Sequence, residues 1–248
     1  MTCDNGVKPR GVGPITGVKI VNRTVRNLAT ALLSVSLIIL CVLVPVHLVA
    51  FNLGFYRSQW EALGVPEGTG MSLADLSGSA SALLGYFTGK VETPQVTVPI
   101  FGEERELYNA KELSHLTDVK SLFGAGLTLE QILAAEVLGI ALYLWKAREL
   151  RTLSRGLLAS GGVNIALLAA LAAIARTDFS DFWTNFHLLT FTNENWLLDP
   201  TSDWLVMMFP EGFFLSAVMR IGILASGISL GYLVLGLVVR NLAAHDRH

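Results

Sequence analysis

Charged residues are scarce in this chain of 248 residues. Asp, Glu, Lys and Arg together make up 15% of the sequence, whereas hydrophobic residues make up 52%. A soluble domain carries about 25% charged residues, so too few charged side chains are present to cover the surface of a soluble protein. The composition also excludes an intrinsically disordered chain, which is poor in hydrophobic residues. It indicates a membrane protein with several spans.

The sequence also lacks the patterns of several common sites. Its two cysteines, Cys3 and Cys41, are too few and too far apart for a disulfide framework or a thiolate zinc site. It contains no H-E-x-x-H motif, no H-x-x-x-x-D motif and no phosphate-binding loop. With a net charge of −2, it has no basic surplus to neutralise phosphates. We therefore expect no metal, no other cofactor and no nucleic-acid partner.

Four apolar runs are each long enough to cross the hydrocarbon core of a bilayer, which takes about 20 helical residues. Because these runs are continuous rather than alternating, they predict helices and not the strands of a membrane barrel. We predict an all-α membrane protein with four transmembrane helices, at residues 28–51, 127–145, 157–174 and 221–239.

The basic residues predict the orientation, because Lys and Arg gather on the cytoplasmic side of a membrane. Most of them lie before the first span, between the second and third spans, and after the fourth, whereas the other two loops are richer in acids. We expect cytoplasmic tails at residues 1–27 and 241–248 around a membrane domain at 28–240. Loops 52–126 and 175–220 would lie outside the cytoplasm and form a cap. We interpret the first span as a retained anchor rather than a signal peptide.

The first outer loop contains three recognisable segments. Residues 73–86 suit a helix, and residues 91–101 suit a short β-hairpin or an extended segment. Asn109, followed by Glu112 three residues later, resembles a capping box, which predicts a helix from there to residue 123.

His115 and Asp118 share one face of this predicted helix, beside an apolar stripe. A carboxylate next to an imidazole can orient its tautomer and support its charged form, as a general base requires. The simpler alternative is a surface pair that stabilises the helix by a few tenths of a kcal/mol.

Residues 182–214 of the second outer loop mix many aromatic side chains with short polar ones. Its tryptophans are typical of the aromatic belt at a membrane surface. The segment is too polar to span the bilayer and too aromatic for a solvated loop, so we expect it to be half immersed in the outer leaflet. Its backbone then needs local hydrogen-bond partners, for which the sequence offers Asn193, Asn195, Asp199, Thr201 and Asp203.

The predicted topology brings His47, His115 and His187 near the outer interface. Histidine titrates near neutral pH and can serve as acid or base. We expect His47, which follows Pro45, to pack or cap its helix. A zinc site built from His115, His187 and a carboxylate stays open as an alternative. Elsewhere, Gly227 and Gly231 are four residues apart and suit a close contact between helices.

Two longer strings resemble the hallmarks of a known family. Residues 107–120 read Leu-Tyr-Asn-Ala-Lys-Glu-Leu-Ser-His-Leu-Thr-Asp-Val-Lys and resemble the pattern N-x-x-E-x-x-H-x-x-D-V-K. Residues 186–214, from Phe-His to Pro-Glu-Gly-Phe-Phe, resemble a second hallmark. With the four spans, residues 26–240 are similar to the bacterial lipoprotein intramolecular transacylase family.

The resemblance implies a multi-pass protein of the bacterial cytoplasmic membrane whose active site faces the outer leaflet. Its partners would be membrane lipids and a lipoprotein whose N-terminal cysteine carries a diacylglyceryl group. As an acyltransferase, it would move the sn-2 acyl chain of that group to the α-amino group of the same cysteine, which gives the lyso-form lipoprotein.

The resemblance also makes His115 and His187 the catalytic centre. Our working expectation is that His115, held by Asp118, is the base and that His187 is the acid or oxyanion donor, although the reverse assignment fits the sequence equally well. The side chains expected to bind or orient the substrate are Asn185, Asn193, Trp196, Asp199, Asp203 and Phe209.

Two other classes of function stay open on the sequence alone. One is a hydrolase or metal-dependent enzyme that acts on another membrane lipid ester, and chelators would inhibit the metal-dependent form. The other is a non-enzymatic envelope factor that binds lipoproteins, and it would tolerate the loss of both histidines.

Overall fold

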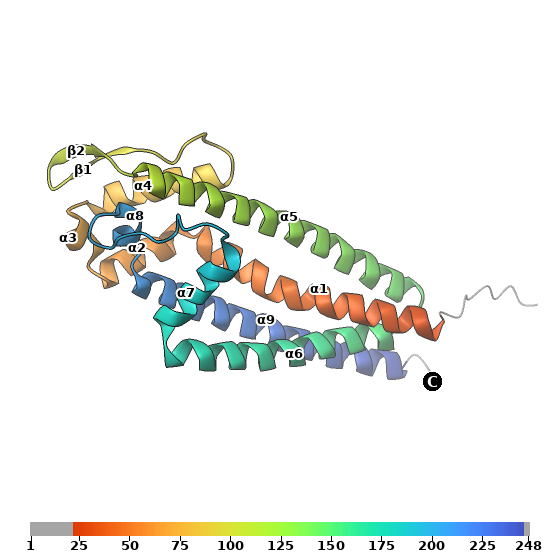
Figure 1. Ribbon diagram of the computed structural model, residues 1–248. Coiled ribbons are helices and arrows are strands. Elements are labelled where there is room, and N and C mark those ends of the chain that lie inside the picture. The colour runs from red at the N-terminus through yellow and green to blue at the C-terminus, as the bar shows by residue number, and fades with distance from the viewer. Residues whose placement is uncertain (1–21, 246–248) are drawn as a thin grey trace, which may run out of the picture.

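The computed structural model describes residues 22–245, apart from the side chains of residues 175–177. Within these residues, four long helices lie along a common axis and alternate in chain direction (Figure 1): α1 (Arg23–Ala50), α5 (Ala110–Lys146), α6 (Leu150–Thr177) and α9 (Glu211–His245). Each contains a stretch long and apolar enough to cross a membrane. The predicted all-α membrane fold is therefore confirmed. Residues 1–21 and 246–248 of the expected tails lie outside the described residues.

The cap gathers at one end of these helices, opposite the end where the described chain starts and finishes (Figure 1). The loops at 52–126 and 175–220 both contribute to it. Between α1 and α5 the chain forms α2 (Leu53–Ala62), α3 (Val65–Thr69), α4 (Leu73–Phe87), β1 (Thr97–Ile100) and β2 (Glu103–Glu106). Between α6 and α9 it forms α7 (Phe179–Thr190) and α8 (Trp204–Met208). The expected helix at 73–86 corresponds to α4.

The hairpin differs in position from the prediction. Only β1 falls within the expected segment 91–101, and it pairs antiparallel with β2, from Thr97 opposite Glu106 to Ile100 opposite Glu103. Phe101 and Gly102 form the turn with φ values of 50° and 86°, as a two-residue hairpin turn requires. The second strand was missed because its Glu-Glu-Arg-Glu sequence has no apolar alternation.

Helix α5 joins two segments that the sequence analysis kept apart. The helix expected at 109–123 and the span expected at 127–145 form one helix, with the predicted capping box of Asn109 and Glu112 at its start. Its 37 residues measure about 55 Å at a rise of about 1.5 Å per residue. The hydrocarbon core is only about 30 Å thick. The first turns of α5 therefore extend past its apolar stretch into the cap.

An aromatic core joins the cap to the bundle. Tyr56 and Trp60 of α2 pack against Phe209, with ring centroids 5.6 and 5.9 Å apart, and Tyr56 also packs against Phe213 of α9. The Trp60 Nε1 donates a hydrogen bond to the carbonyl of Met208 at 2.8 Å. Phe209, which we expected among the acyl chains, is buried in this core.

Helices α6 and α9 approach closely at glycines. A Cβ on Gly161 would lie 2.8 Å from the carbonyl oxygen of Ser229, and one on Gly236 would lie equally close to a leucine side chain of α6. The predicted contact at Gly227 and Gly231 is wrong, because a Cβ at either position would meet open space. The spacing of small residues alone did not tell which face of α9 meets its neighbour.

We expect Gly161→Ala to lower the free energy of unfolding by about 1–3 kcal/mol, as overpacking typically does. The new methyl group would overlap a backbone carbonyl, which cannot rotate away as a side chain can. Thermal unfolding of the purified protein in detergent micelles measures the effect. The matched control is Gly227→Ala, which places its methyl group in open space and favours the helix. Equal losses in the two variants would show that this packing is not tight.

Candidate active site

His115 and His187 lie next to each other in the cap. Their ring centroids are 6.1 Å apart and their planes are tilted by 36°. Both residues are largely buried, with 7% and 9% of their surface exposed. His115 comes from the first turns of α5 and His187 from the last turn of α7. The two segments of the cap therefore meet at the two histidines of the family motifs.

Helix α7 fixes the tautomer of His187. The His187 Nδ1 lies 2.8 Å from the carbonyl oxygen of Trp183, one turn earlier in the helix. Because a carbonyl oxygen can only accept, Nδ1 must carry the proton of the neutral ring. The lone pair of that ring is then on Nε2, which makes this nitrogen the available proton acceptor.

Burial lowers the pKa of His187 below its ordinary value of 6.5, because removal from water disfavours the charged imidazolium; the hydrogen bond to the Trp183 carbonyl opposes this shift in part. Two neighbouring buried imidazoles also resist double protonation, since like charges repel. The structure therefore favours a neutral His187 at physiological pH.

The His115 Nδ1 is buried and has no hydrogen-bond partner among the described residues. Buried polar atoms in folded proteins nearly always have partners, so an exception needs an explanation. The fold therefore does not fix the tautomer of His115, and a bound molecule reaches this nitrogen only if a neighbouring side chain moves.

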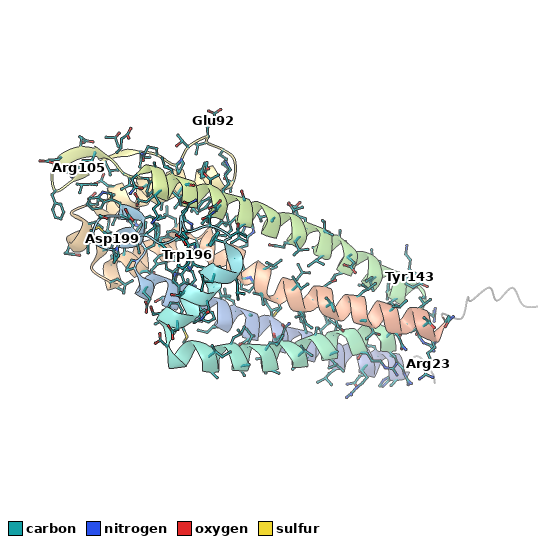
Figure 2. All side chains as sticks on the ribbon, viewed as in Figure 1. Arg23, Glu92, Arg105, Tyr143, Trp196 and Asp199 are labelled. Atoms are coloured by element: carbon teal, nitrogen blue, oxygen red, sulfur yellow. The ribbon has the colours of Figure 1, made fainter. Side chains whose placement is uncertain are left out.

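Aromatic rings surround the imidazole pair. Trp196 stacks on His187 with centroids 4.9 Å apart, and Trp183 meets the same ring edge-on at 4.8 Å. Phe191 contacts both imidazoles, at 5.1 Å from His115 and 5.7 Å from His187. Figure 2 shows Trp196 at the cap end, in the most crowded group of side chains. Trp183 and Phe191 were missed as site residues, although Trp183 is one helical turn from His187.

We call residues 191–203, which connect α7 to α8, the strap. Hydrogen bonds join the strap to α5 on both sides of His115. The Asn193 Nδ2 donates to the Asp118 Oδ2 at 2.9 Å, and the Asn195 Nδ2 donates to the Ser114 Oγ at 2.9 Å. These two bonds hold the strap across the helix that carries His115.

Asp118 is thus bonded to the strap, and no hydrogen bond joins it to His115 in the part of the chain that the structure describes. Its carboxylate lies near the imidazole without contacting the ring nitrogen. Among residues 22–245, no group of three or more His, Cys, Asp or Glu side chains is arranged to hold a metal ion.

The other expected substrate residues take different positions. Asp199 accepts hydrogen bonds within its own turn of the strap. Asp203 is buried and accepts from the side chain of Asn109 at 2.8 Å. Asn185 is exposed and donates to the carbonyl of Asp181 at 2.8 Å. It precedes His187 by two residues, which places it about 200° away around α7, so the structure does not bring it to the histidine pair.

Residues 227–231 read Gly-Ile-Ser-Leu-Gly and match the G-x-S-x-G string of serine hydrolases. They lie in the middle of α9, however, and not at the strand-to-helix turn that exposes a nucleophilic serine. Ser229 is fully buried, donates to the carbonyl of Ala225 and contacts the Cys41 Sγ at 3.2 Å. This segment belongs to the packing of the bundle.

His47 lies apart from this site, between two of the long helices. Its Nδ1 is 3.5 Å from the Glu130 Oε2 of α5, and its ring packs on Phe51 at 4.8 Å. The second carboxylate of the α5 span, Glu136, accepts a hydrogen bond from Ser36 at 3.0 Å. These polar groups link α1 to α5, in keeping with the packing role expected for His47.

A family model described as lipoprotein intramolecular transacylase Lit matches residues 31–214. The chain belongs to the lipoprotein intramolecular transacylase family. The matched range contains both histidines, the whole strap and the cap segments that position them. Family membership and the geometry of the imidazole pair therefore direct attention to the same part of the molecule.

Solved structures share the transacylase fold. The structure of the membrane-integral lipoprotein intramolecular transacylase from Bacillus cereus matches with a TM-score of 0.75 at 20% identity, and the match covers 91% of this chain and 99% of that one. Two variants of that protein, with a histidine replaced by arginine or by alanine, give TM-scores of 0.72 and 0.71 at 19% and 20% identity. These two matches cover 90% of this chain and 95% and 96% of theirs. No curated relative matches the chain.

We expect the imidazole of His187 to titrate below 6.5 and to carry its neutral-state proton on Nδ1, because it is buried and bonded to a carbonyl. Nitrogen NMR of histidine-labelled protein in nanodiscs measures both properties, and His187→Ala assigns the signal. Trp196→Ala admits water to the ring and should move the pKa back toward 6.5. A His187 that titrates above 6.5 in the unaltered protein would contradict its buried, neutral state.

Proposed function

We propose that this protein moves an acyl chain within a bacterial lipoprotein. The chain leaves the sn-2 oxygen of the diacylglyceryl group on the N-terminal cysteine and joins the α-amino group of the same cysteine, which gives the lyso-form lipoprotein. The observation that carries this proposal is the pair of buried imidazoles 6.1 Å apart, one with a fixed tautomer and one with an unpartnered nitrogen. Membership of the transacylase family supports the substrate class.

The geometry favours His187 as the base, which is the second of the two assignments that the sequence left open. Its Nε2 takes the proton of the amine while the amine nitrogen attacks the ester carbonyl. His115 then supports the oxyanion by donating a hydrogen bond from a ring N–H. The imidazolium of His187, stabilised by the Trp183 carbonyl, returns the proton to the departing glycerol oxygen.

This reaction balances without another reactant. An amide C–N bond forms, the ester C–O bond breaks, and one proton passes from the amine nitrogen to the glycerol oxygen. Since the amine and the ester belong to one molecule, holding them close supplies much of the lowering of the barrier. No serine, threonine or cysteine side chain hydrogen bonds to either imidazole among the residues described here, which supports direct attack by the substrate amine.

The surroundings of the pair suit a lipid substrate. Trp196 offers an apolar wall next to His187, and Phe191 offers one next to both imidazoles. On the outer side of α7, Leu188 and Leu189 are 62% and 89% exposed, as expected of a helix that lies in the membrane interface. In this proposal Asp118 and Asn193 act together by holding the strap over the site.

The charge distribution supports a cap outside the cytoplasm. Arg23 and Tyr143 lie at one end of the bundle and Asp199 at the other (Figure 2). The end that contains Arg23 also holds Lys146, at the close of α5, and Arg148 in the turn that follows. By the positive-inside rule, both termini would be cytoplasmic, the membrane domain 28–240 would lie in the bacterial cytoplasmic membrane, and the site would face the outer leaflet.

We expect His115→Ala and His187→Ala each to lower the rate of acyl transfer by about 100- to 10,000-fold, the usual contribution of an acid or base group. Purified protein in nanodiscs is mixed with a diacylated lipopeptide, and mass spectrometry locates the acyl chains. His245→Ala is the matched control, because this exposed histidine lies at the opposite end of the molecule.

The products separate the proposal from its alternatives. Release of free fatty acid without amide formation would identify a hydrolase, and inhibition by chelators would identify a metal-dependent enzyme. Unshifted acyl chains with correctly folded protein would reject the transacylase activity.

The rate should fall at acid pH. The proposed base must be neutral to accept a proton, and the pKa of His187 lies below 6.5 because of burial. His187 is therefore neutral at pH 7, and the base is lost as the pH falls through that lowered value. The attacking α-amino group of the substrate, with an ordinary pKa of about 8, adds a limb of its own, which is the same for every variant. The pH profile of kcat/KM checks this. In Trp196→Ala the acid limb should move to higher pH, whereas a limb that stays at the same pH in this variant would count against His187 as the base.

A further inference from the structure

Helices α5 and α8 cap each other through one buried carboxylate. The backbone N–H of Asn109 donates to the Glu112 Oε2 at 2.8 Å, which is half of the α5 capping box. The other oxygen of the same carboxylate, Oε1, accepts from the backbone N–H of Leu205 at 2.6 Å, in the first turn of α8. Glu112 has 0% exposed surface. A single side chain therefore accepts hydrogen bonds from backbone N–H groups at the N-terminal ends of two helices.

Helix α8 also contacts the start of α5, through Asp203. Asp203, at the N-cap position of α8, makes no capping hydrogen bond within its own helix. Its Oδ1 instead accepts from the Asn109 Nδ2 at 2.8 Å, and its Oδ2 accepts from the backbone N–H of Asp199 at 2.7 Å. We call these contacts of Asn109, Glu112, Asp203 and Leu205 the cap exchange. It ties the far end of the strap to the start of α5.

The cap exchange lies one helical turn from the catalytic pair. Glu112 precedes His115 by three residues on α5, so the two side chains lie on neighbouring parts of one face. Between the cap exchange and the earlier contacts of Asn193 and Asn195, the strap carries Trp196, whose ring stacks on His187. The Nζ of Lys111 donates to the carbonyl of Leu197, the residue after this tryptophan.

We propose that Glu112 is a positioning residue for acyl transfer: its carboxylate fixes the strap to α5 and thereby sets the position of His187, through Trp196, relative to His115. This inference rests on the proposed function. It assigns Glu112 no contact with the substrate and no proton transfer. The residue acts through the distance and angle between the two imidazoles.

The position requires a carboxylate and not an amide. Each oxygen of Glu112 accepts from a different buried backbone N–H, and a glutamine offers only one acceptor oxygen. In Glu112→Gln one N–H would therefore face an NH₂ donor, so either the start of α5 or the start of α8 must move. The substitution preserves size and shape, which makes it a test of the second acceptor.

We expect Glu112→Gln to lower kcat by about 10- to 100-fold, as displacements of about 1 Å do in active sites. KM should stay within about twofold, because the residue does not contact the substrate. The acid limb should stay in place or move toward that of Trp196→Ala, since the titrating group is still His187 and a looser strap admits water to its ring. Hydrogen exchange measured by mass spectrometry should become faster in residues 191–205 and stay unchanged in α1 and α9.

Asp75→Asn is the matched control. Asp75 fills the same N3 position in the capping box of α4, where it bonds to Ser72 at an exposed helix end. Both bonds from Ser72 go to one oxygen, Oδ2, and an asparagine still offers one acceptor oxygen. The substitution therefore changes a capping carboxylate to an amide away from the strap, so kcat and the exchange of residues 191–205 should match those of the unaltered protein. If Glu112→Gln does not accumulate as folded protein, Asp203→Asn replaces it, because it weakens the other half of the cap exchange.

Each outcome decides the proposal. Faster strap exchange together with a lower kcat and a retained acid limb supports positioning by Glu112. Unchanged kcat overturns it, whether or not the strap loosens, and so does a lower kcat with unchanged strap exchange. Loss of the acid limb would show a direct role in proton transfer instead. If the unaltered protein transfers no acyl chain, the proposed function fails, and the strap exchange and the NMR signal of His187 still test whether Glu112 sets the position of that ring.

Discussion

The length of α5 relative to the bilayer is the constraint on which the site depends. A helix of about 55 Å cannot end within a hydrocarbon core about 30 Å thick, so its first turns form part of the cap. His115 lies on those turns, and so do Asn109, Glu112 and Asp118, to which the strap is fastened. The bundle that crosses the membrane thus supplies a rigid support for the histidine pair, which would be less exactly held on a loop.

Burial of the imidazoles has two consequences that act together. It keeps His187 neutral, because the charged ring is disfavoured away from water, and it surrounds both rings with aromatic side chains, which contact the acyl chains in the proposed function. Orientation of His187 comes from a backbone carbonyl and not from a carboxylate. A neutral acceptor fixes the tautomer without placing a fixed negative charge in the aromatic wall, where an unpaired charge would be costly.

The carboxylates of Glu112 and Asp118 show which contacts a sequence pattern can predict and which it cannot. The spacing of His115 and Asp118 correctly indicated a shared helix face, yet the carboxylate bonds to Asn193 of a segment far along the chain. Glu112 was predicted only as half of a local capping box, and its second oxygen reaches Leu205. In both cases the pattern defines the local helix, while the partner depends on how the strap crosses α5. Phe209 and Asn185 show the same limit, because aromatic or polar character does not tell which way a side chain points.

The sequence alone determined the membrane fold, the approximate positions of the four long helices and the N-cap of α5 at Asn109. Each of these depends on composition or on local patterns, which a single chain displays directly. The choice of His115 and His187 rested on the resemblance of two segments to the family motifs. Only the tertiary structure decided that the imidazoles lie 6.1 Å apart, that Trp196 stacks on His187, and that α6 and α9 touch at Gly161 and Gly236 rather than at Gly227 and Gly231. Those features are relations between segments distant in the chain, and packing selects them from many arrangements that have the same local pattern.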